Sequence, residues 1–258
     1  MSVDSYPEFA EGVAIVSGGT GGIGEAIVRD LARSGSNVAF TYYSNTDAAE
    51  TLLAEIKGLG VKAECIKLDT RDVEKTQAFI DDVVARYGKL HSVVNAAGPP
   101  LELGFISQIT PAQWAKVMRA DIEACYNFIW PALQHLKRQR SGSIVAMVTA
   151  LVDRPPIKDI LSAAPKAAVQ ALIRGIALEE GRFGVRANCV GPGFLDAGVG
   201  ADILAEEKEG YVNLILPAIP MRRLGKAEEI AKAVTFLLSD RAQYITGTMI
   251  PVDGGFKL

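Results

Sequence analysis

Short apolar runs rich in β-branched residues alternate with amphipathic stretches along nearly the whole chain. Between the runs, helical patterns cover residues 22–34, 46–59, 72–87, 113–140, 165–182 and 227–238. The runs themselves predict seven buried strands, at residues 13–16, 38–40, 63–67, 92–94, 143–148, 185–190 and 248–252. Strict alternation of this kind is built from βαβ units. The sequence therefore predicts an α/β fold, a doubly wound seven-stranded parallel sheet with helices on both faces.

Length and composition favour one domain around one core. The 258 residues lie near the upper limit for a single hydrophobic core, and 49% hydrophobic with 22% charged residues is close to the average for globular proteins. Since no linker or repeat interrupts the pattern, we expect residues 1–258 to form a single domain. The segment at about residues 194–223 breaks the rhythm with glycines and prolines, and it predicts a lid or substrate loop.

Charge and cysteine content exclude several classes of function. The net charge is −3 and no basic stripe of helix length is present, so a nucleic-acid surface is not expected. Cys65, Cys125 and Cys189 are far apart and odd in number, without clustered histidines, which indicates a reduced, cytoplasmic protein with no metal site. The start of the chain lacks the pattern of a signal peptide, and no apolar stretch has membrane-spanning length. We expect a small-molecule substrate and no membrane partner.

A glycine-rich turn directly follows the first predicted strand and precedes a helical pattern. It reads S-G-G-T-G-G-I-G over residues 17–24. Side chains at Gly18, Gly22 and Gly24 would obstruct the turn, a bound pyrophosphate or the packing of the helix, and the helix N-terminus supplies partial positive charge. The alternative is a tight turn without a ligand. The order of strand, glycines and helix favours a dinucleotide site.

Four further motifs recur in the expected order. Asp69 follows the third strand, N-A-A-G occupies residues 95–98, Pro-Gly occupies 192–193 and D-G-G occupies 253–255. With the glycine turn, they resemble the classical short-chain dehydrogenase/reductase family, in which Thr usually stands where this chain has Ser17. The resemblance implies a Rossmann-type fold that binds NAD(P) and assembles as a homo-oligomer, a tetramer or dimer. It assigns the cofactor to Gly18, Thr20, Gly22, Ile23, Gly24, Tyr42, Ser44, Asp69, Thr70, Asn95, Ala96, Gly98, Lys166, Pro192 and Gly193.

The residue that ends the second strand bears on the choice of cofactor. A carboxylate there would bind the ribose 2′-hydroxyl of NAD and repel the 2′-phosphate of NADP. This chain has Tyr42 at that position, so the repulsion is missing. No Arg or Lys lies in the same stretch or in the glycine turn to pair with the phosphate. The sequence favours NADP(H) over NAD(H) only because no carboxylate is present to repel the 2′-phosphate.

The resemblance also implies four catalytic positions, usually Ser, Tyr, Lys and Asn. Lys166 matches, in the segment S-A-A-P-K-A-A. The Tyr four residues earlier is Ser162, the Ser thirteen residues before that is Thr149, and the Asn falls on Asp121. A phenol with a pKa near 10 can be drawn toward neutrality by a neighbouring cation, whereas an aliphatic hydroxyl is a far weaker acid. The proton-transfer set therefore departs from the family pattern.

The proton donor stays open at this point. Ser162 can hold a water, or it can be the N-cap of a helix that contains Pro165 in its first turn. Asp121 can act as an acid if it is desolvated, or it can be an exposed helix charge or the partner in a salt bridge. Other candidate donors are Asp153, Lys158, Asp159 and Tyr211.

The best-supported function is an NAD(P)(H)-dependent oxidoreductase that reduces a carbonyl or enone of a small or acyl substrate. One alternative is a nucleotide-binding protein without turnover, a sensor or the inactive partner in an assembly. Another is a lyase or isomerase in which Lys166, Thr149 and Asp121 transfer protons without redox chemistry.

Overall fold

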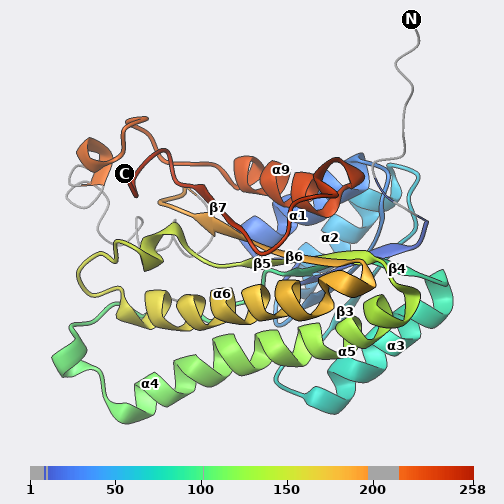
Figure 1. The fold of residues 1–258 in the computed structure, drawn as a ribbon, viewed down its shortest axis with the longest axis horizontal. Helices are drawn as coiled ribbons and strands as arrows, with labels where there is room; N and C mark the ends of the chain where they lie inside the picture. Colours follow the sequence, from blue (N-terminus) through green and yellow to red (C-terminus); the bar gives the residue numbers. More distant parts are fainter. Residues whose placement is uncertain (1–8, 10, 101, 197–214) are drawn as a thin grey trace, which may run out of the picture.

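A single parallel sheet of seven strands organises the protein (Figure 1). The computed structural model describes residues 9, 11–100, 102–196 and 215–258. The strand order is β3-β2-β1-β4-β5-β6-β7, and every neighbouring pair is parallel. This confirms the predicted doubly wound α/β fold. The strands are β1 Val13–Ser17, β2 Asn37–Tyr42, β3 Ala63–Lys67, β4 Leu90–Asn95, β5 Gly142–Met147, β6 Val185–Pro192 and β7 Met249–Val252.

Helices cover both faces of the sheet (Figure 1). On one face lie α1 Gly22–Arg33, α2 Thr46–Lys57 and α9 Ala227–Leu238. On the other lie α3 Val73–Tyr87, α5 Ala124–Gln139 and α6 Ile160–Glu180, with α4 Pro111–Met118 leading into α5. Alternate residues of a strand point to opposite faces, so Ala14 and Val16 pack under α1 and α9 while Val13 and Ile15 pack on the opposite face. Burial on both faces explains why the central strands are apolar throughout.

The two edge strands are less buried than the sequence predicts. β3 and β7 were expected to be buried, yet Ile66 of β3 is 41% exposed and no residue of β7 is fully buried. Each edge strand has a neighbour on one side only, and the helices cover the middle of the sheet more completely than its margins. An apolar run therefore predicted the strands correctly but overstated their burial.

Two helices differ from the predicted boundaries. The pattern at residues 113–140 is divided by a π turn, Arg119–Glu123, between α4 and α5. α6 begins at Ile160 with Asp159 as its N-cap, so Ser162 lies inside the helix and its predicted N-cap role is wrong. Pro165 removes one helix hydrogen bond, but its fixed φ suits a helix and its neighbours Leu161, Ala163 and Val169 are buried. Packing of the apolar side of α6 outweighs the lost bond.

The predicted lid lies largely outside the described residues, which include 194–196 and 215–223 of it. Leu195 forms a parallel bridge with Gly225, and Ile215 and Ile219 join a small apolar cluster with Leu151 and Phe256. Of the described helices, none combines the length and the apolar character needed to cross a membrane.

Candidate functional site

The turn between β1 and α1 requires glycine for steric reasons. Gly18 has φ +70°, and a Cβ there would lie 2.8 Å from the backbone N and Cα of Ala97. A Cβ on Gly24 would lie 2.1 Å from the carbonyl oxygen of Gly18. A Cβ on Gly19 would lie 2.5 Å from the ring of Phe40, a requirement that sequence reasoning missed because Phe40 belongs to another strand. The turn is thus a close-packed cradle of bare backbone.

The N-terminus of α1 is open to an anion. Gly21 is its N-cap, and no side chain caps the first amides. Thr20 precedes Gly21, and Gly22 and Ile23 follow it. All three are half-buried. Uncapped amides at a helix N-terminus carry partial positive charge and bind phosphate groups. The geometry fits the pyrophosphate of a dinucleotide.

The glycine turn is joined to the end of β4 by hydrogen bonds. The Ser17 hydroxyl donates to Asn95 Oδ1 at 2.9 Å and accepts from the amides of Ala96 and Ala97, each at 3.2 Å. Among the described residues, the buried Asn95 Nδ2 has no hydrogen-bond partner. The strand order reverses between β1 and β4, and ligands of doubly wound sheets bind outside the strand ends at such a point. We call the β1–α1 turn with residues 95–98 the cofactor crevice.

At the end of β2, tyrosines stand where an acid would select NAD. Tyr42 is 9% exposed and Tyr43 is 63% exposed, and Ser44 follows on the surface. Both side chains that carry a hydroxyl group beyond β2, Tyr43 and Ser44, are thus open to a ligand. Thr70, after β3, is buried.

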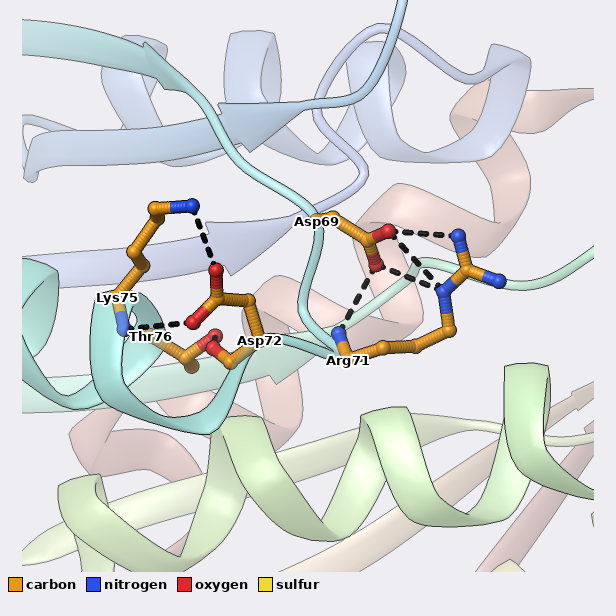
Figure 2. A network of polar contacts seen from close by, with 5 residues as sticks. All are labelled: Asp69, Arg71, Asp72, Lys75 and Thr76. Atoms are coloured by element: carbon orange, nitrogen blue, oxygen red, sulfur yellow. Dashed lines mark hydrogen bonds and ion pairs between the residues drawn. The ribbon is translucent and has the colours of Figure 1, made fainter.

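Arg71 is a cation close to Asp69 and Tyr43 that sequence reasoning missed. Its guanidinium donates to both carboxylate oxygens of Asp69, at 2.6 to 3.1 Å (Figure 2). The hydrogen bond from Arg71 lowers the pKa of the Asp69 carboxyl. Asp69 and, more weakly, Tyr43 raise the pKa of Arg71. Arg71 comes from the loop before α3, outside the second strand and the glycine turn from which a partner for the phosphate was expected.

Lys166 and Asp121 form a buried ion pair. Lys166 Nζ lies 2.7 Å from Asp121 Oδ1, and their side chains are 15% and 3% exposed. The π turn that separates α4 from α5 contains Asp121, and such turns often occur at functional sites. A Cβ on Gly98 would lie 3.5 Å from Lys166 Nζ, so the ammonium group also borders the cofactor crevice. Three segments far apart in sequence therefore meet at one cation.

The two other predicted catalytic residues are placed differently. Ser162 is half-buried on α6, one turn before Lys166. The Thr149 hydroxyl donates to the Pro192 carbonyl at 3.3 Å and accepts from the Leu151 amide at 3.1 Å. It links the ends of β5 and β6 through the backbone. The single hydroxyl proton of Thr149 is therefore already used in a hydrogen bond.

The Pro-Gly and D-G-G motifs pack against each other at the end of β6. A Cβ on Gly193 would lie 2.7 Å from the Cα and Cβ of Asp253. The Gly193 amide donates to the Val252 carbonyl, and Asp253 accepts from the Gly255 amide. Two motifs more than fifty residues apart thus form one tight corner beside the crevice.

The remaining titratable candidates fall into two groups. Asp153 pairs with Lys257, and Lys158 lies over the ring of Phe105. Burial lowers the pKa of His91 to about 4, and its ring bonds to serine hydroxyls within the core. By contrast, burial raises the pKa of Asp159 to about 6. Nowhere in the described residues do three or more potential ligands gather to hold a metal ion.

Comparisons with known proteins agree with this geometry. A family model described as enoyl-(acyl carrier protein) reductase matches residues 18–257. The 3-oxoacyl-(acyl-carrier-protein) reductase FabG of Staphylococcus aureus is 34% identical over 95% of this chain and 98% of its own length. The acetoacetyl-CoA reductase of Synechocystis is 36% identical over 94% of this chain and 95% of its own.

Solved structures give the same result. A short-chain dehydrogenase/reductase of Serratia marcescens superposes with a TM-score of 0.89 at 30% identity, covering 98% of this chain and 100% of its own. One from Mycobacterium ulcerans superposes with a TM-score of 0.91 at 27% identity, covering 97% of this chain and 91% of its own. The chain belongs to the short-chain dehydrogenase/reductase family. It is an oxidoreductase of the Rossmann type.

Proposed function

We propose that the protein reduces the ketone of a 3-oxoacyl thioester with NADPH. Two relatives that align over almost the whole chain are named for ketone reduction on acyl carrier protein or coenzyme A. The observation that carries the proposal is the position of Lys166, beside Gly98 of the cofactor crevice and at the second turn of α6. One charged group therefore borders both the cofactor and the place where a substrate would react.

The choice of NADPH rests on charge at the ends of β2 and β3. Tyr42 brings no negative charge toward a 2′-phosphate, and Arg71 brings a guanidinium beside the exposed Tyr43. Arg71 donates from Nε and one terminal nitrogen to Asp69, and its side chain is 52% exposed, so a phosphate can reach the guanidinium. Replacing Arg71 by Leu should weaken NADPH binding about tenfold and leave NADH binding within about twofold.

The chain's own residues would bind the cofactor, orient the substrate and stabilise charge. A bound nicotinamide cofactor supplies the hydride. The uncapped amides of α1 would hold the pyrophosphate, and Asn95 and Gly98 would line the path toward the reacting carbon. Lys166, fixed by Asp121, would bind the ribose hydroxyls and stabilise the negative charge that develops on the substrate oxygen.

Two measurements test this function. Fluorescence titration with NADPH and NADH tests the nucleotide site, and loss of NADPH absorbance with acetoacetyl-CoA tests reduction. A crotonyl-CoA sample distinguishes ketone from enone reduction. Binding of NADPH with conversion of acetoacetyl-CoA supports the proposal. Failure to bind either nucleotide contradicts it.

A second candidate is a nucleotide-binding protein without turnover. It is favoured by the hydrogen bond of Thr149 to Pro192 and the ion pair of Lys166 with Asp121, which occupy two of the four positions that the family pattern makes catalytic. This candidate predicts NADPH binding without oxidation by any carbonyl substrate. A lyase or isomerase would instead form product without consuming NADPH.

We propose that the enzyme acts as a homo-oligomer in the cytoplasm. Apolar side chains on the outer faces of α5 and α6 are exposed, with Trp130 at 41% and Leu178 at 85%. Exposed apolar side chains on neighbouring helices favour contact with a second copy. All three cysteines are free, as expected in a reducing compartment. Light scattering tests the oligomeric state, and Leu178→Glu should reduce the number of subunits in the assembly.

A further inference from the structure

Ketone reduction by this site needs an acid, because negative charge builds on the carbonyl oxygen as hydride reaches the carbon. The phenol that the family pattern places one helical turn before Lys166 is replaced by Ser162, and an aliphatic hydroxyl is a far weaker acid. The hydroxyl proton of Thr149 is used in a hydrogen bond, and Tyr211 lies outside the described residues. The proton source therefore stays unassigned among the residues that carry hydroxyl groups.

The ammonium group of Lys166 lies at the border of the cofactor crevice and can be reached from it. A Cβ on Gly98 would lie 3.5 Å from Nζ, so a ligand that packs on Gly98 would also lie close to the ammonium. The Lys166 side chain is 15% exposed, whereas the side chain of Asp121 is 3% exposed. A ligand in the crevice can therefore contact the nitrogen of this ion pair, and the carboxylate lies behind it.

The ammonium group has donors to spare. It carries three N–H bonds, and among the described residues its hydrogen bond to Asp121 Oδ1, at 2.7 Å, uses one of them. Two remain, one for a ribose hydroxyl and one for a substrate oxygen. In model peptides the pKa of an ammonium side chain is about 10.4 and that of a phenol is about 10. An ammonium group is therefore about as strong an acid as the phenol that this chain lacks.

We propose that the Lys166 ammonium is itself the acid that protonates the oxygen of the reduced ketone, and that Asp121 is its positioning residue. This inference rests on the proposed function. The carbonyl carbon accepts hydride, with oxidation of NADPH to NADP⁺, and the π electron pair moves to the oxygen. The oxygen takes a proton from Lys166 Nζ, and the electron pair of the broken N–H bond stays on the nitrogen. The resulting amine regains a proton from water.

Asp121 keeps the lysine protonated until it reacts. A mostly buried ammonium without a counter-ion loses its proton readily, and a carboxylate at hydrogen-bonding distance opposes that loss. The described titratable groups that face Lys166 are Asp121 of the π turn, Cys125 of α5 and Cys189 of β6. Burial raises the pKa of each thiol to about 12. Of these three groups, only Asp121 therefore brings a charge to the ammonium near neutral pH.

A pH profile distinguishes an acid from a residue that only binds the cofactor. With acetoacetyl-CoA and saturating NADPH, the rate of hydride transfer in single turnovers should fall about tenfold per pH unit in the alkaline range. Asp121→Asn removes the negative charge but keeps an oxygen for the hydrogen bond, so the fall should begin at least about one pH unit lower. Asp153→Asn, which loses an exposed pair with Lys257, should keep the wild-type profile. Ionisation of the substrate is common to all variants and cancels in the comparison.

Replacement of Lys166 separates proton donation from positive charge. Lys166→Arg keeps a cation beside Asp121, but a guanidinium does not give up its proton in proteins. The rate of hydride transfer should fall at least about 100-fold, while NADPH affinity by fluorescence should change less than about tenfold. Adding Ser162→Tyr to Lys166→Arg supplies a phenol one helical turn away and should restore at least about tenfold of the rate, which also shows that the variant is folded.

Four outcomes contradict the assignment. An Asp121→Asn profile identical to that of the wild type, or a rate in Lys166→Arg within about tenfold of the wild type, overturns it and leaves the proposed function intact. A loss of NADPH affinity in Lys166→Arg equal to the loss of rate shows a cofactor-binding role alone and also overturns it. A loss of about 100-fold in Tyr211→Phe would give the proton to that phenol instead. Absence of turnover in the wild-type enzyme overturns the assignment and the proposed function together.

Discussion

The cofactor crevice and the ion pair of Lys166 with Asp121 lie next to each other but are built in different ways. The crevice is formed by the backbone. Its shape depends on the positive φ of Gly18, on the close approach of Gly24 to the Gly18 carbonyl and on the uncapped amides of α1. The neighbouring cluster is made of side chains, because Lys166 of α6 is paired with Asp121 from another element. Backbone cradles depend on short motifs, whereas the side-chain cluster depends on which helices meet. The two regions should therefore respond differently to substitution.

The largest effect on stability is expected at the Lys166–Asp121 pair. Asp121→Ala leaves the mostly buried ammonium of Lys166 without its partner and should lower the free energy of unfolding by about 3 to 5 kcal/mol. Urea denaturation measures this. The double variant Asp121→Ala/Lys166→Met should regain much of the loss because it removes the unpaired charge. Glu102→Ala, which breaks the exposed pair with Lys116, should cost less than about 1 kcal/mol.

The crevice should lose cofactor binding when a single methyl group is added. Gly18→Ala places a Cβ against the backbone of Ala97 and strains a positive φ, so NADPH affinity should fall about 100-fold, equal to about 2.7 kcal/mol. Gly21→Ala is the control in the same turn, because its Cβ would lie 3.4 Å from the nearest atom. Fluorescence titration compares the two. Equal losses would show that the turn does not depend on this close approach.

Burial of Asp159 should make the free energy of unfolding decrease as the pH rises. Its folded pKa is about 6 against an ordinary value of 3.8, so the unfolded chain releases the proton first and the folded state is penalised as pH rises between these values. Asp159→Asn should therefore be more stable than the wild type at pH 7, by up to about 3 kcal/mol. The advantage should disappear below about pH 4. Thermal unfolding across this range measures it, and a constant difference would contradict burial of an ionisable carboxyl.

The smallest effect is expected at Thr149. Thr149→Val removes the hydrogen bonds to the Pro192 carbonyl and the Leu151 amide and should cost about 1 to 2 kcal/mol. Thr149→Ser keeps the hydroxyl and should cost less than about 1 kcal/mol. If Thr149→Val abolishes reduction while unfolding is unchanged, the hydroxyl serves the substrate and not the backbone.

Sequence reasoning succeeded where a residue acts through its neighbours in the chain. The alternation of strands and helices predicted the sheet, and the glycine turn predicted the backbone cradle between β1 and α1. It failed where the partner is distant. Ser162 has the local pattern of an N-cap, but α6 begins two residues before it because side chains along the helix are buried. Gly19 must be glycine because of Phe40, and Arg71 interacts with Tyr43 from a loop that no local pattern connects to β2.

By itself, the sequence determined the layered parallel sheet and the bare turn after its first strand, because hydrophobic periodicity and the steric freedom of glycine are properties of short segments. Only the tertiary structure decided which charges meet. It paired Asp121, in a π turn, with Lys166, and it engaged the Thr149 hydroxyl with the end of β6. Among the described residues, it left Asp159 Oδ2 buried without a hydrogen-bond partner. Electrostatic interactions depend on distance and on exclusion of water, and both are properties of the assembled elements.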